Sequence, residues 1–366
     1  MHDVHIVGWG VVPFGKHVER THKDLARAAI TAALQDAGVK GTEVQSIAFA
    51  SCALHAFGQG SVRGPVVLGP MMNDGTLASL PTTDVEAACA SGMVAFETAC
   101  RDIMSGRVET ALAVGVDKTF VPDMTQLGAL FAGAFDALDP HTAVYTEAAR
   151  ALGTTFAPSP TRLLTLDVCA LLALHAMRST GLTLTDLATV AARAKGLTVE
   201  QVLADKPILA PFTRAMCTGI ADGAAAVILS SRRPASGPAV RVRSLTRVRG
   251  HRVTFEAPSV TERAAASLWG SVEAPQIDVA EVHDATAYSL IAARRALRLS
   301  DQVVLNPSGG LLKRGHALAA TGLSMVASVT HALRTTGATR GLVHNAGGFA
   351  GLDEAVCALA VLERVS

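Results

Sequence analysis

The sequence predicts an α/β protein in which helices cover parallel sheets. Hydrophobic residues make up 49% of the 366 residues and aromatic residues only 4%, which favours close packing of helices on sheets over a β-sandwich or a disordered chain. A small-residue turn leads twice into a helix and then an apolar strand, over residues 87–115 and 315–345. That order is typical of parallel sheets with helical crossovers. The two segments do not share residue identity, but their shared element order suggests two similar halves.

Each predicted element depends on its own pattern. A helix is predicted over 24–37, where Leu25, Ala29 and Leu34 recur at helical spacing and Gly38 follows as a stop. The other elements are, in chain order, a strand at 46–50, a helix at 93–104, strands at 110–115 and 222–230, a helix at 323–333 and a strand at 341–345. The Pro-, Ser- and Gly-rich stretch 233–238 is the predicted linker between a first half, 1–232, and a second half, 239–366.

Residues of about 119–205 form a segment that lacks strand alternation. Helical patterns occur there at 142–152, 165–179 and 184–194. Such an insertion is a natural cap over an active site, so a helical cap is predicted. Apolar side chains of the cap are candidates for a pocket wall, and ordinary core packing explains them equally well. They are Met124, Leu127, Leu130, Phe131 and Phe135.

Charge gives no reason to expect a nucleic-acid partner, because the formal net charge is only +1. A local group of arginines stands at mostly odd spacing, which favours the solvated face of a strand over a site for an anionic cofactor tail. The group consists of Arg241, Arg243, Arg247, Arg249 and Arg252.

Cysteine and histidine spacing argues against two further kinds of site. The six cysteines show no paired spacing and the twelve histidines show no metal-ligand spacing, so neither a disulfide framework nor a bound metal is predicted. No basic region followed by an apolar core opens the sequence, and no apolar run is long enough to span a bilayer. The sequence is interpreted as that of a cytoplasmic protein without a membrane partner.

The run from Asp84 to Met93 is the most informative part of the sequence. It places Cys89 among Ala, Ser and Gly, directly before the helix predicted at 93–104. Small neighbours would let a substrate reach the thiol, and the positive end of the helix dipole would lower its pKa. A cysteine before a helix is more often inert packing, so the nucleophile hypothesis depends on the rest of the sequence.

Three further motifs contain histidines, and all lie in the second half. They are Glu281-Val-His-Asp-Ala-Thr-Ala-Tyr288, Asn306-Pro-Ser-Gly-Gly-Leu-Leu-Lys-Arg-Gly-His316 and Leu342-Val-His-Asn-Ala-Gly-Gly348. Each is predicted near the end of a strand. Because ligands of α/β folds bind at the carboxyl ends of strands, we expect these motifs to meet Cys89 at one site.

With these motifs the chain resembles the thiolase superfamily, and most closely thiolases of the sterol-carrier-protein type. The resemblance begins at Val7-Gly-Trp-Gly-Val-Val-Pro-Phe-Gly15, includes the Cys89 run, residues 106–118 and Asp222-Gly-Ala-Ala-Ala226, and ends with the histidine motifs. It covers nearly the whole chain. It implies the thiolase fold, with two similar α/β halves in a five-layer α/β/α/β/α arrangement, a mixed sheet in each half and a central helix layer that carries Cys89.

The resemblance also implies catalytic roles. Cys89 would attack an acyl thioester and hold the acyl group, while His316 would take the thiol proton and keep the thiolate near a cation. His283 would bind the thioester oxygen of the second substrate together with a water molecule. His344 stands where many thiolases have a second cysteine, and would polarise the substrate or shuttle a proton instead.

Backbone and side-chain groups would support these residues. The N–H of Cys89, with Gly347 or its neighbour, would form the oxyanion hole. Asn306, Asn345 and Asp284 are further site candidates, although both asparagines are explained equally well as turn formers. The resemblance implies no permanently bound cofactor and a coenzyme A thioester as co-substrate.

Two positions depart from the sterol-carrier type. The family's His-Asp-Cys-Phe is His283-Asp284-Ala285-Thr286 here, and its Gly-His-Pro is Gly315-His316-Ala317. The missing cysteine is the family's proton-abstracting base, and Ala285 cannot ionise. Cys357 falls in the pattern of the last strand and is assigned to the core. The acylating residues are therefore complete, whereas carbanion formation lacks its base.

This asymmetry favours an acyltransferase that moves the acyl group from Cys89 to an acceptor that is already nucleophilic, with C-acylation ahead of heteroatom acylation. The alternative within the family is conventional Claisen condensation or its thiolytic reverse, with His344 or His283 as the base. A hypothesis of another class is a noncatalytic acyl-CoA-binding or scaffold subunit, which would need neither Cys89 nor His316.

The resemblance implies partners as well. Family members are homodimers through the sheet of the first half, or tetramers, and thiolases of this type often occur with a small companion protein that has an OB-fold and a zinc ribbon. The acyl donor would be acyl-CoA or an acyl carrier protein. Candidates for phosphate contacts are Arg162, Arg193, Lys195 and Arg214.

Overall fold

The computed structural model describes residues 2–121, 124–139, 141–159, 162–269 and 276–365. Ten of the strands among these residues form two groups of five. The first group comprises β1 (His5–Gly15), β2 (Ser46–Ala50), β3 (Thr82–Val85), β4 (Thr110–Asp117) and β7 (Asp222–Ser230). The second comprises β8 (Ala239–Arg249), β9 (Val279–Val282), β10 (Val304–Leu305), β11 (Arg340–Phe349) and β12 (Glu354–Val365). Together they form one sheet in the order β10-β9-β11-β12-β8-β1-β7-β4-β2-β3.

The two groups repeat the same topology. β2 pairs in parallel with β3 and β4, and β9 pairs in parallel with β10 and β11. β7 then joins β4 to β1, and β12 joins β11 to β8, by antiparallel pairing. The groups meet where His5 and Ile6 of β1 pair with Arg241 and Val240 of β8. Two similar halves are therefore confirmed, and each half has a mixed sheet and not a purely parallel one.

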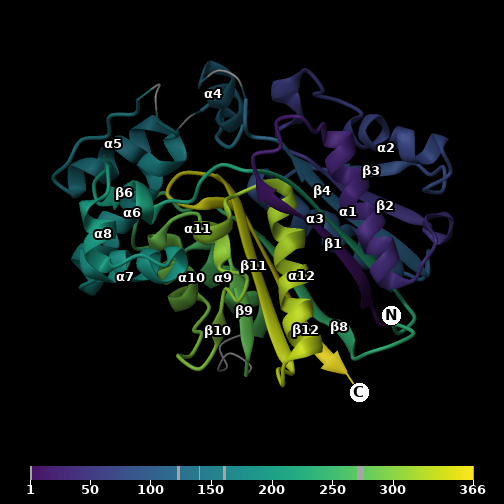
Figure 1. The fold of residues 1–366 in the computed structure, drawn as a ribbon. Coiled ribbons are helices and arrows are strands. Elements are labelled where there is room, and N and C mark those ends of the chain that lie inside the picture. Colours follow the sequence, from purple (N-terminus) through teal and green to yellow (C-terminus); the bar gives the residue numbers. More distant parts are fainter. Residues whose placement is uncertain (1, 122–123, 140, 160–161, 270–275, 366) are drawn as a thin grey trace.

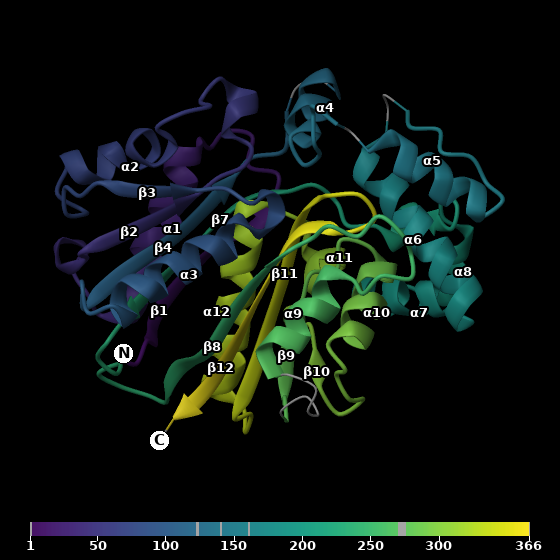
Figure 2. The same cartoon turned by 180° about the vertical axis from the view of Figure 1, so that it is seen from behind.

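Helices form three layers around the two halves of the sheet (Figures 1 and 2). α1 (His22–Ala37) and α2 (Arg63–Asn73) cover the outer face of the first half, and α9 (Val260–Trp269) and α10 (Ala287–Ala296) cover that of the second. α3 (Ser91–Met104) and α12 (Ala319–Thr335) lie between the halves and contact strands of both. Separate hydrophobic clusters fill the spaces between the layers. The five-layer arrangement is confirmed.

The ends of α1 show how local sequence defines an element. The Thr21 hydroxyl accepts the N–H of Asp24 at 3.2 Å, and the Asp24 carboxylate accepts the N–H of Thr21 at 2.8 Å. The helix ends at Gly38, which has a left-handed φ of 63°. Such a capping box and glycine stop stabilise the two ends of a helix. Leu25 and Ala29 are fully buried against the sheet, as their spacing predicts.

The contact between α1 and β1 leaves no room for a side chain at Gly10. A Cβ atom there would lie 2.1 Å from the carbonyl oxygen of Ala29, whereas a Cβ at Gly15 would meet nothing within 4 Å. We expect Gly10→Ala to lower the free energy of unfolding by roughly 1–3 kcal/mol, because overpacking displaces the helix from the sheet. Gly15→Ala, the matched control, should change it by less than about 0.5 kcal/mol. Denaturant titrations followed by circular dichroism measure both, and equal effects would contradict the packing argument.

The described part of the cap contains α4 (Met124–Ala132), α5 (Thr142–Ala151), α6 (Leu164–Thr180), α7 (Leu184–Lys195) and α8 (Val199–Ala204). α5, α6 and α7 match the predicted helices to within one residue at each end. α4, α8 and the short hairpin of β5 (Pro207–Leu209) and β6 (Phe212–Thr213) have no counterpart among the predicted elements. Figure 1 shows α5 to α8 beside α10 and α11 (Gly310–Arg314), at one end of the molecule. No described helix is both long enough and apolar enough to cross a bilayer.

Four arginines of the predicted group, Arg241 to Arg249, lie in β8, as their spacing predicts. Arg252 lies after the strand and donates to the Leu352 carbonyl. Arg243, Arg247 and Arg249 are exposed, and the Arg241 guanidinium pairs with the Glu363 carboxylate at 2.8 Å. These positions support the solvated face of a strand over a site for an anionic cofactor tail. The segment 233–238 connects β7 to β8, and we keep it as a proposed boundary between the two halves.

Candidate active site

Cys89 lies in a tight turn immediately before α3. The turn is η3 (Ala88–Ala90), in which Ala88 has a left-handed φ of 48°. The N–H of Ala88 donates to the Glu86 carboxylate at 2.6 Å, and the Ser91 hydroxyl donates to the carbonyl of Ala88 at 2.6 Å. These bonds stabilise a backbone conformation that residues other than glycine rarely adopt. The turn places the half-buried Cys89 at the walls of two cavities.

Strand β11 packs directly on this turn at Gly347. A Cβ atom at Gly347 would lie 2.5 Å from the backbone nitrogen of Ala90 and 2.7 Å from that of Cys89. Glycine alone leaves room for two backbones this close. The structure therefore brings Gly347 beside Cys89, where the predicted oxyanion hole requires it.

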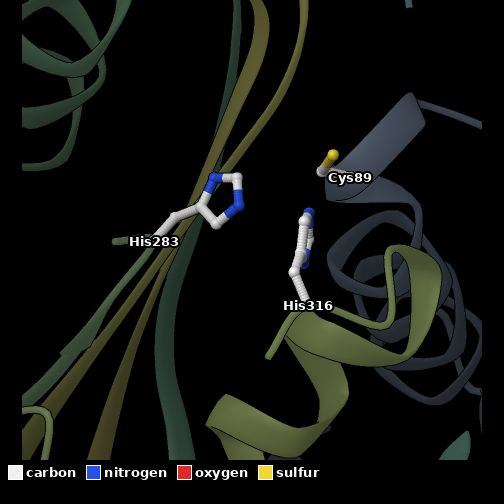
Figure 3. A group of neighbouring side chains, drawn as sticks. All are labelled: Cys89, His283 and His316. Atoms are coloured by element: carbon white, nitrogen blue, oxygen red, sulfur yellow. The ribbon is translucent and has the colours of Figure 1, made fainter. Parts of the chain in front are cut away.

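His316 lies between α11 and α12. The backbone N–H of His316 donates to the Gly219 carbonyl at 2.9 Å. The ring nitrogen Nδ1 lies 2.8 Å from the Thr321 hydroxyl. Nε2 is buried without a hydrogen-bond partner among the described residues. When Nδ1–H donates to Thr321, Nε2 is an acceptor that can take the thiol proton. Figure 3 shows the ring beside Cys89.

His283 follows β9 and lies on the other side of the same space (Figure 3). Its ring centroid is 5.0 Å from that of His316, with an interplanar angle of 55°. Sγ of Cys89 and one nitrogen of each ring all lie within 4.8 Å of one another. The fold thus brings together three predicted groups that are far apart in the sequence. Within the described part of the chain, these three are also the group that could hold a metal ion, which sequence spacing does not indicate.

Burial determines the charge state of all three groups. It raises the pKa of Cys89 to about 12, with the Asp117 carboxylate as the second cause, and it lowers the pKa of His283 to about 4. Burial and then His283 also lower the pKa of His316 well below its ordinary value. The resting site therefore holds a neutral thiol and neutral imidazoles. The low thiol pKa predicted from the helix dipole is wrong, because burial and Asp117 outweigh the dipole.

This charge state predicts how the thiol reacts in the resting enzyme. Thiolate is the nucleophilic form of cysteine, and a raised pKa keeps its population small below that pKa. We expect the rate of Cys89 alkylation by iodoacetamide to rise roughly tenfold per pH unit from about pH 6 to about pH 9, without a plateau. Mass spectrometry of the Cys89 peptide gives the rate. A plateau near neutral pH would reveal a preformed thiolate–imidazolium pair and contradict the neutral site.

His344 does not reach the thiol. In β11 its Nδ1 accepts the N–H of His283 at 3.3 Å, and its Nε2 lies 3.1 Å from the Thr261 hydroxyl of α9. Both ring nitrogens are therefore engaged on the outer face of the sheet, and burial lowers the pKa of His344 to about 3. The structure places His344 behind His283, where it positions the backbone of that residue. These contacts give no support to the predicted acid/base role.

Asn345 does not line the cavity that contains Cys89 either. It is fully buried, and a Cβ atom at Gly322 of α12 would lie 2.7 Å from its side-chain oxygen. Neighbouring residues of a strand face opposite sides of the sheet. His344 therefore contacts the outer helix layer and Asn345 contacts the central one, and neither lines the cavity with Cys89.

Asn306 and Asp284 support the segment around His283. The Asn306 side chain accepts the N–H of Val282 at 2.7 Å and donates to the carbonyl of Val282 at 3.3 Å. The Asp284 carboxylate accepts the N–H of Leu311 at 2.7 Å, and burial raises its pKa to about 7. Both side chains bind backbone groups, so the structure assigns them a positioning role.

Cys89, His283 and His316 line a largely apolar cavity of about 120 Å³. A cavity of roughly 150 Å³ holds a benzene molecule, so this one has about the volume of a short acyl group or a small ring. Its apolar wall consists of Phe131, Leu163, Leu166, Ile220 and Phe349, among others.

The predicted pocket residues of the cap have different positions. Phe131 lines this cavity, and Leu130 lines the neighbouring one. Leu127 is buried, and Phe135 stacks on Phe349 with ring centroids 5.5 Å apart. The side chain of Met124 lies outside the described residues.

A second cavity, of about 320 Å³, shares Cys89 and Phe131 with the first and is more polar. Its lining includes Cys52, Arg63 and Glu86. The predicted phosphate contacts line neither cavity. The side chains of Arg162, Lys195 and Arg214 are engaged with other groups of this chain. The side chain of Arg193 is exposed.

Ala285 lines the first cavity, at the position of the sterol-carrier type's basic cysteine. Its carbonyl accepts the N–H of Thr218 at 3.0 Å. Cys357 is fully buried, with its sulfur 3.8 Å from the Thr261 hydroxyl, and it does not line this cavity. No ionisable side chain therefore replaces the missing cysteine at this position.

Sequence reasoning missed three features of the site. Thr218 to Ile220 line the cavity, and their only signal is a place directly before the apolar strand β7. Glu354, the first residue of β12, also lines it. Asp117 ends β4 and accepts the N–H groups of Ala53 and Ala319, each at 2.9 Å. Its place at a strand's carboxyl end was the available signal.

Two family models match the chain. Residues 4–130 match "Thiolase, N-terminal domain" and residues 248–358 match "Thiolase, C-terminal domain". An acetyl-CoA acetyltransferase of Methanothermobacter thermautotrophicus is 28% identical, over 96% of this chain and 98% of that protein. Sterol carrier protein 2 of Gallus gallus is 25% identical, over 94% of this chain and 69% of that protein.

Solved structures share the fold. A structure named "Ltp2-ChsH2(DUF35) aldolase" gives a TM-score of 0.74 at 15% identity and covers 99% of this chain and 98% of that chain. Human mitochondrial 3-ketoacyl-CoA thiolase gives 0.73 at 16% identity and covers 100% of this chain and 99% of that chain. The family matches, the relatives and the fold agree that this chain is an acyltransferase that belongs to the thiolase family.

Proposed function

We propose that the protein forms an acyl thioester on Cys89 from acyl-CoA and passes the acyl group to an acceptor that is already nucleophilic. The observation that carries this proposal is the convergence of Cys89, His283 and His316 within 4.8 Å, in a cavity where Ala285 replaces a base. The name of one relative, acetyl-CoA acetyltransferase, supports a short acyl-CoA as the donor, and an acyl carrier protein is the alternative donor.

In the first step, Sγ of Cys89 attacks the thioester carbon and its proton passes to Nε2 of His316. The proton moves together with the attack, because the pKa values of thiol and imidazole keep both neutral at rest. Thr321 orients the ring through Nδ1. The N–H of Cys89, beside Gly347, binds the oxyanion, and such a donor is worth ~3–4 kcal/mol of barrier. The bond to the CoA sulfur then breaks, and the leaving thiolate takes the proton from His316.

In the second step, the acceptor attacks the acyl carbon, the bond to Sγ breaks, and the proton lost by the acceptor returns to Sγ through His316. The ring of His283 donates to the Ala346 carbonyl, so its Nε2, which has no partner among the described residues, would accept a hydrogen bond from an O–H group of the acceptor. Ala285 cannot remove a proton from an unactivated carbon, so the acceptor must supply its own electron density, as an enol or an electron-rich ring does. C-acylation is therefore favoured over heteroatom acylation.

Conventional Claisen condensation or thiolysis is the second candidate. Its support is the name of the acetyl-CoA acetyltransferase relative, together with a neutral His283 whose Nε2 has no partner among the described residues. His283 is therefore the preferred base of this alternative. His344 would first have to give up its bonds to Thr261 and to the backbone of His283.

Hydrogen exchange separates the two candidates. Acetyl-CoA is incubated with the protein in D₂O, acetylation of Cys89 is followed by mass spectrometry, and deuterium in the acetyl methyl group is followed by NMR. We expect acetylation without enzyme-dependent exchange. Exchange that keeps pace with acetylation and disappears in His283→Ala would establish Claisen chemistry instead.

We also propose that the protein works as a homodimer or tetramer together with a small companion of the OB-fold and zinc-ribbon kind. One structural neighbour supports a companion, because its name includes a second component with the label DUF35. Acyl-CoA would reach Cys89 through the second, more polar cavity, whose lining includes Arg63. Analytical ultracentrifugation of the purified chain tests its oligomeric state.

A further inference from the structure

The cavity that holds Cys89 contains a carboxyl group that the acyl-transfer steps above do not use. It belongs to Glu354, the acidic residue among the described residues that line this cavity. Glu354 begins β12 and stands directly opposite Phe349 of β11, which lines the same cavity. Glu354 is half-buried, as expected of a side chain in the wall of an open cavity.

No described residue neutralises this carboxyl. Its hydrogen bond is to its own N–H, and no hydrogen bond or ion pair joins it to the side chain of another described residue. The neighbouring cation, Arg252, donates to the Leu352 carbonyl at 3.0 and 2.8 Å. Asp353, the adjacent acid, differs in this respect, because it pairs with Arg263 at 3.0 Å.

An unpaired carboxylate in such a position is unfavourable for the fold. Burial raises the pKa of Glu354, Asp353 raises it further, and Arg252 opposes them. Buried charges in proteins are normally paired or hydrogen-bonded. A carboxyl that lines a cavity and lacks a protein partner is suited to a hydrogen-bond donor on a ligand.

Gly347 of β11 packs on the turn that holds Cys89, and Glu354 pairs with Phe349, two residues farther along β11. Glu354 therefore lies about 7 Å along the strand from the point where β11 meets that turn. Burial is the largest cause that raises the pKa of Cys169 of α6, and the Glu354 carboxylate is the second largest. Cys89 contributes less. Asp117 and Glu86 are the carboxylates that act on Cys89 itself. Cys169 lines the cavity as well.

The polar end of the cavity is small. Ser289 of α10 hydrogen-bonds with the Cys169 thiol, and its hydroxyl lies 2.9 Å from that of Thr286. Leu166 and Phe349 line the cavity between polar groups. A ligand that fills this space has one end at the acyl carbon on Cys89 and the other at Glu354.

We propose that Glu354 accepts a hydrogen bond from an O–H or N–H group at the far end of the acceptor, and so selects small acceptors that carry such a donor. This inference depends on the proposed function, in which the acceptor enters the cavity beside acyl-Cys89. The acceptor class that results is a single-ring or similarly small molecule with a hydroxyl or amino group opposite the acylated atom.

Phenol and toluene test this selection, because they differ in a hydroxyl in place of a methyl group. Ligand-observed NMR gives the ratio of the two dissociation constants for each protein. The proteins are wild type, Glu354→Leu, Glu354→Gln and Glu256→Gln. Glu256→Gln is the control, because Glu256 is exposed. We expect Glu354→Leu to reduce the preference for phenol about tenfold or more, since hydrogen bonds to charged groups are the strong ones. Glu354→Gln should have an intermediate effect and Glu256→Gln none.

An unchanged ratio in Glu354→Leu, or no binding of either probe by the wild type, would overturn the proposal. Acetylation of Cys89 by acetyl-CoA is measured on the same samples. It should persist in Glu256→Gln, and circular dichroism shows whether the Glu354 variants fold like the wild type. A wild type that binds phenol through Glu354 but is never acetylated would contradict the proposed function and leave the selection by Glu354 standing.

Discussion

Incubation with acetyl-CoA is expected to add one acetyl group to the wild-type protein, and Cys89→Ala is expected to remove this label completely. The Cys89 thiol lines both cavities and lies within 4.8 Å of two histidine nitrogens, so it is placed to meet a donor from one side and an acceptor from the other. Intact-protein mass spectrometry measures the label directly. The experiment needs no knowledge of the acceptor, because the first half-reaction stops at the acyl-enzyme when no acceptor is present.

Cys52 offers a matched control for this experiment. It is half-buried like Cys89 and lines the second cavity with it. Its thiol, however, donates to the Asp117 carboxylate at 3.2 Å, and burial and then Asp117 raise its pKa well above the ordinary value. Cys52→Ala should therefore keep full acetylation. A label that survives Cys89→Ala, or disappears in Cys52→Ala, would show that the nucleophile is assigned wrongly.

The elements that sequence predicts well are those with a complete local signal. α1 has helical apolar spacing, a capping box at Thr21 and a stop at Gly38, and β7 is buried along its whole length, as its uninterrupted apolar run predicts. α2 lacks such a signal, because Pro70 stands inside it. Its helix depends on the burial of Val67 and Leu68 against the sheet, and tertiary packing of this kind is not visible in local spacing.

The site also combines features that local sequence predicts with features that depend on tertiary structure. Sequence motifs single out Cys89, His283 and His316, and the fold brings these three side chains together. The pKa of Cys89 could not be predicted in this way, since it depends on enclosure by the cap and on Asp117 at the end of a different element. For His344 a signal was available. The alternation along β11 already places His344 and Asn345 on opposite faces of the sheet, so the two could not both face one cavity.

Ala285→Cys is expected to give the protein an exchange activity that the wild type lacks. Ala285 lines the cavity with Cys89 and His283, and the Thr218 N–H holds its carbonyl, so the backbone is positioned independently of the side chain. A thiol at this position restores the group that serves as proton-abstracting base in the sterol-carrier type. A positioned acid or base contributes about 10²- to 10⁴-fold, and the rate of deuterium incorporation into acetyl-CoA should rise by that order, while acetylation of Cys89 changes little.

Ala285→Ser is the matched control, because it adds a group of similar size that does not act as a base near neutral pH. If the serine variant gains as much exchange as the cysteine variant, added polarity and not basicity is responsible. If the wild type already exchanges as fast as Ala285→Cys, then His283 serves as the base and Claisen chemistry is the better description. Exchange that appears only with the thiol would instead locate the difference between this chain and a conventional thiolase at one methyl group, with the acylating residues Cys89 and His316 unchanged.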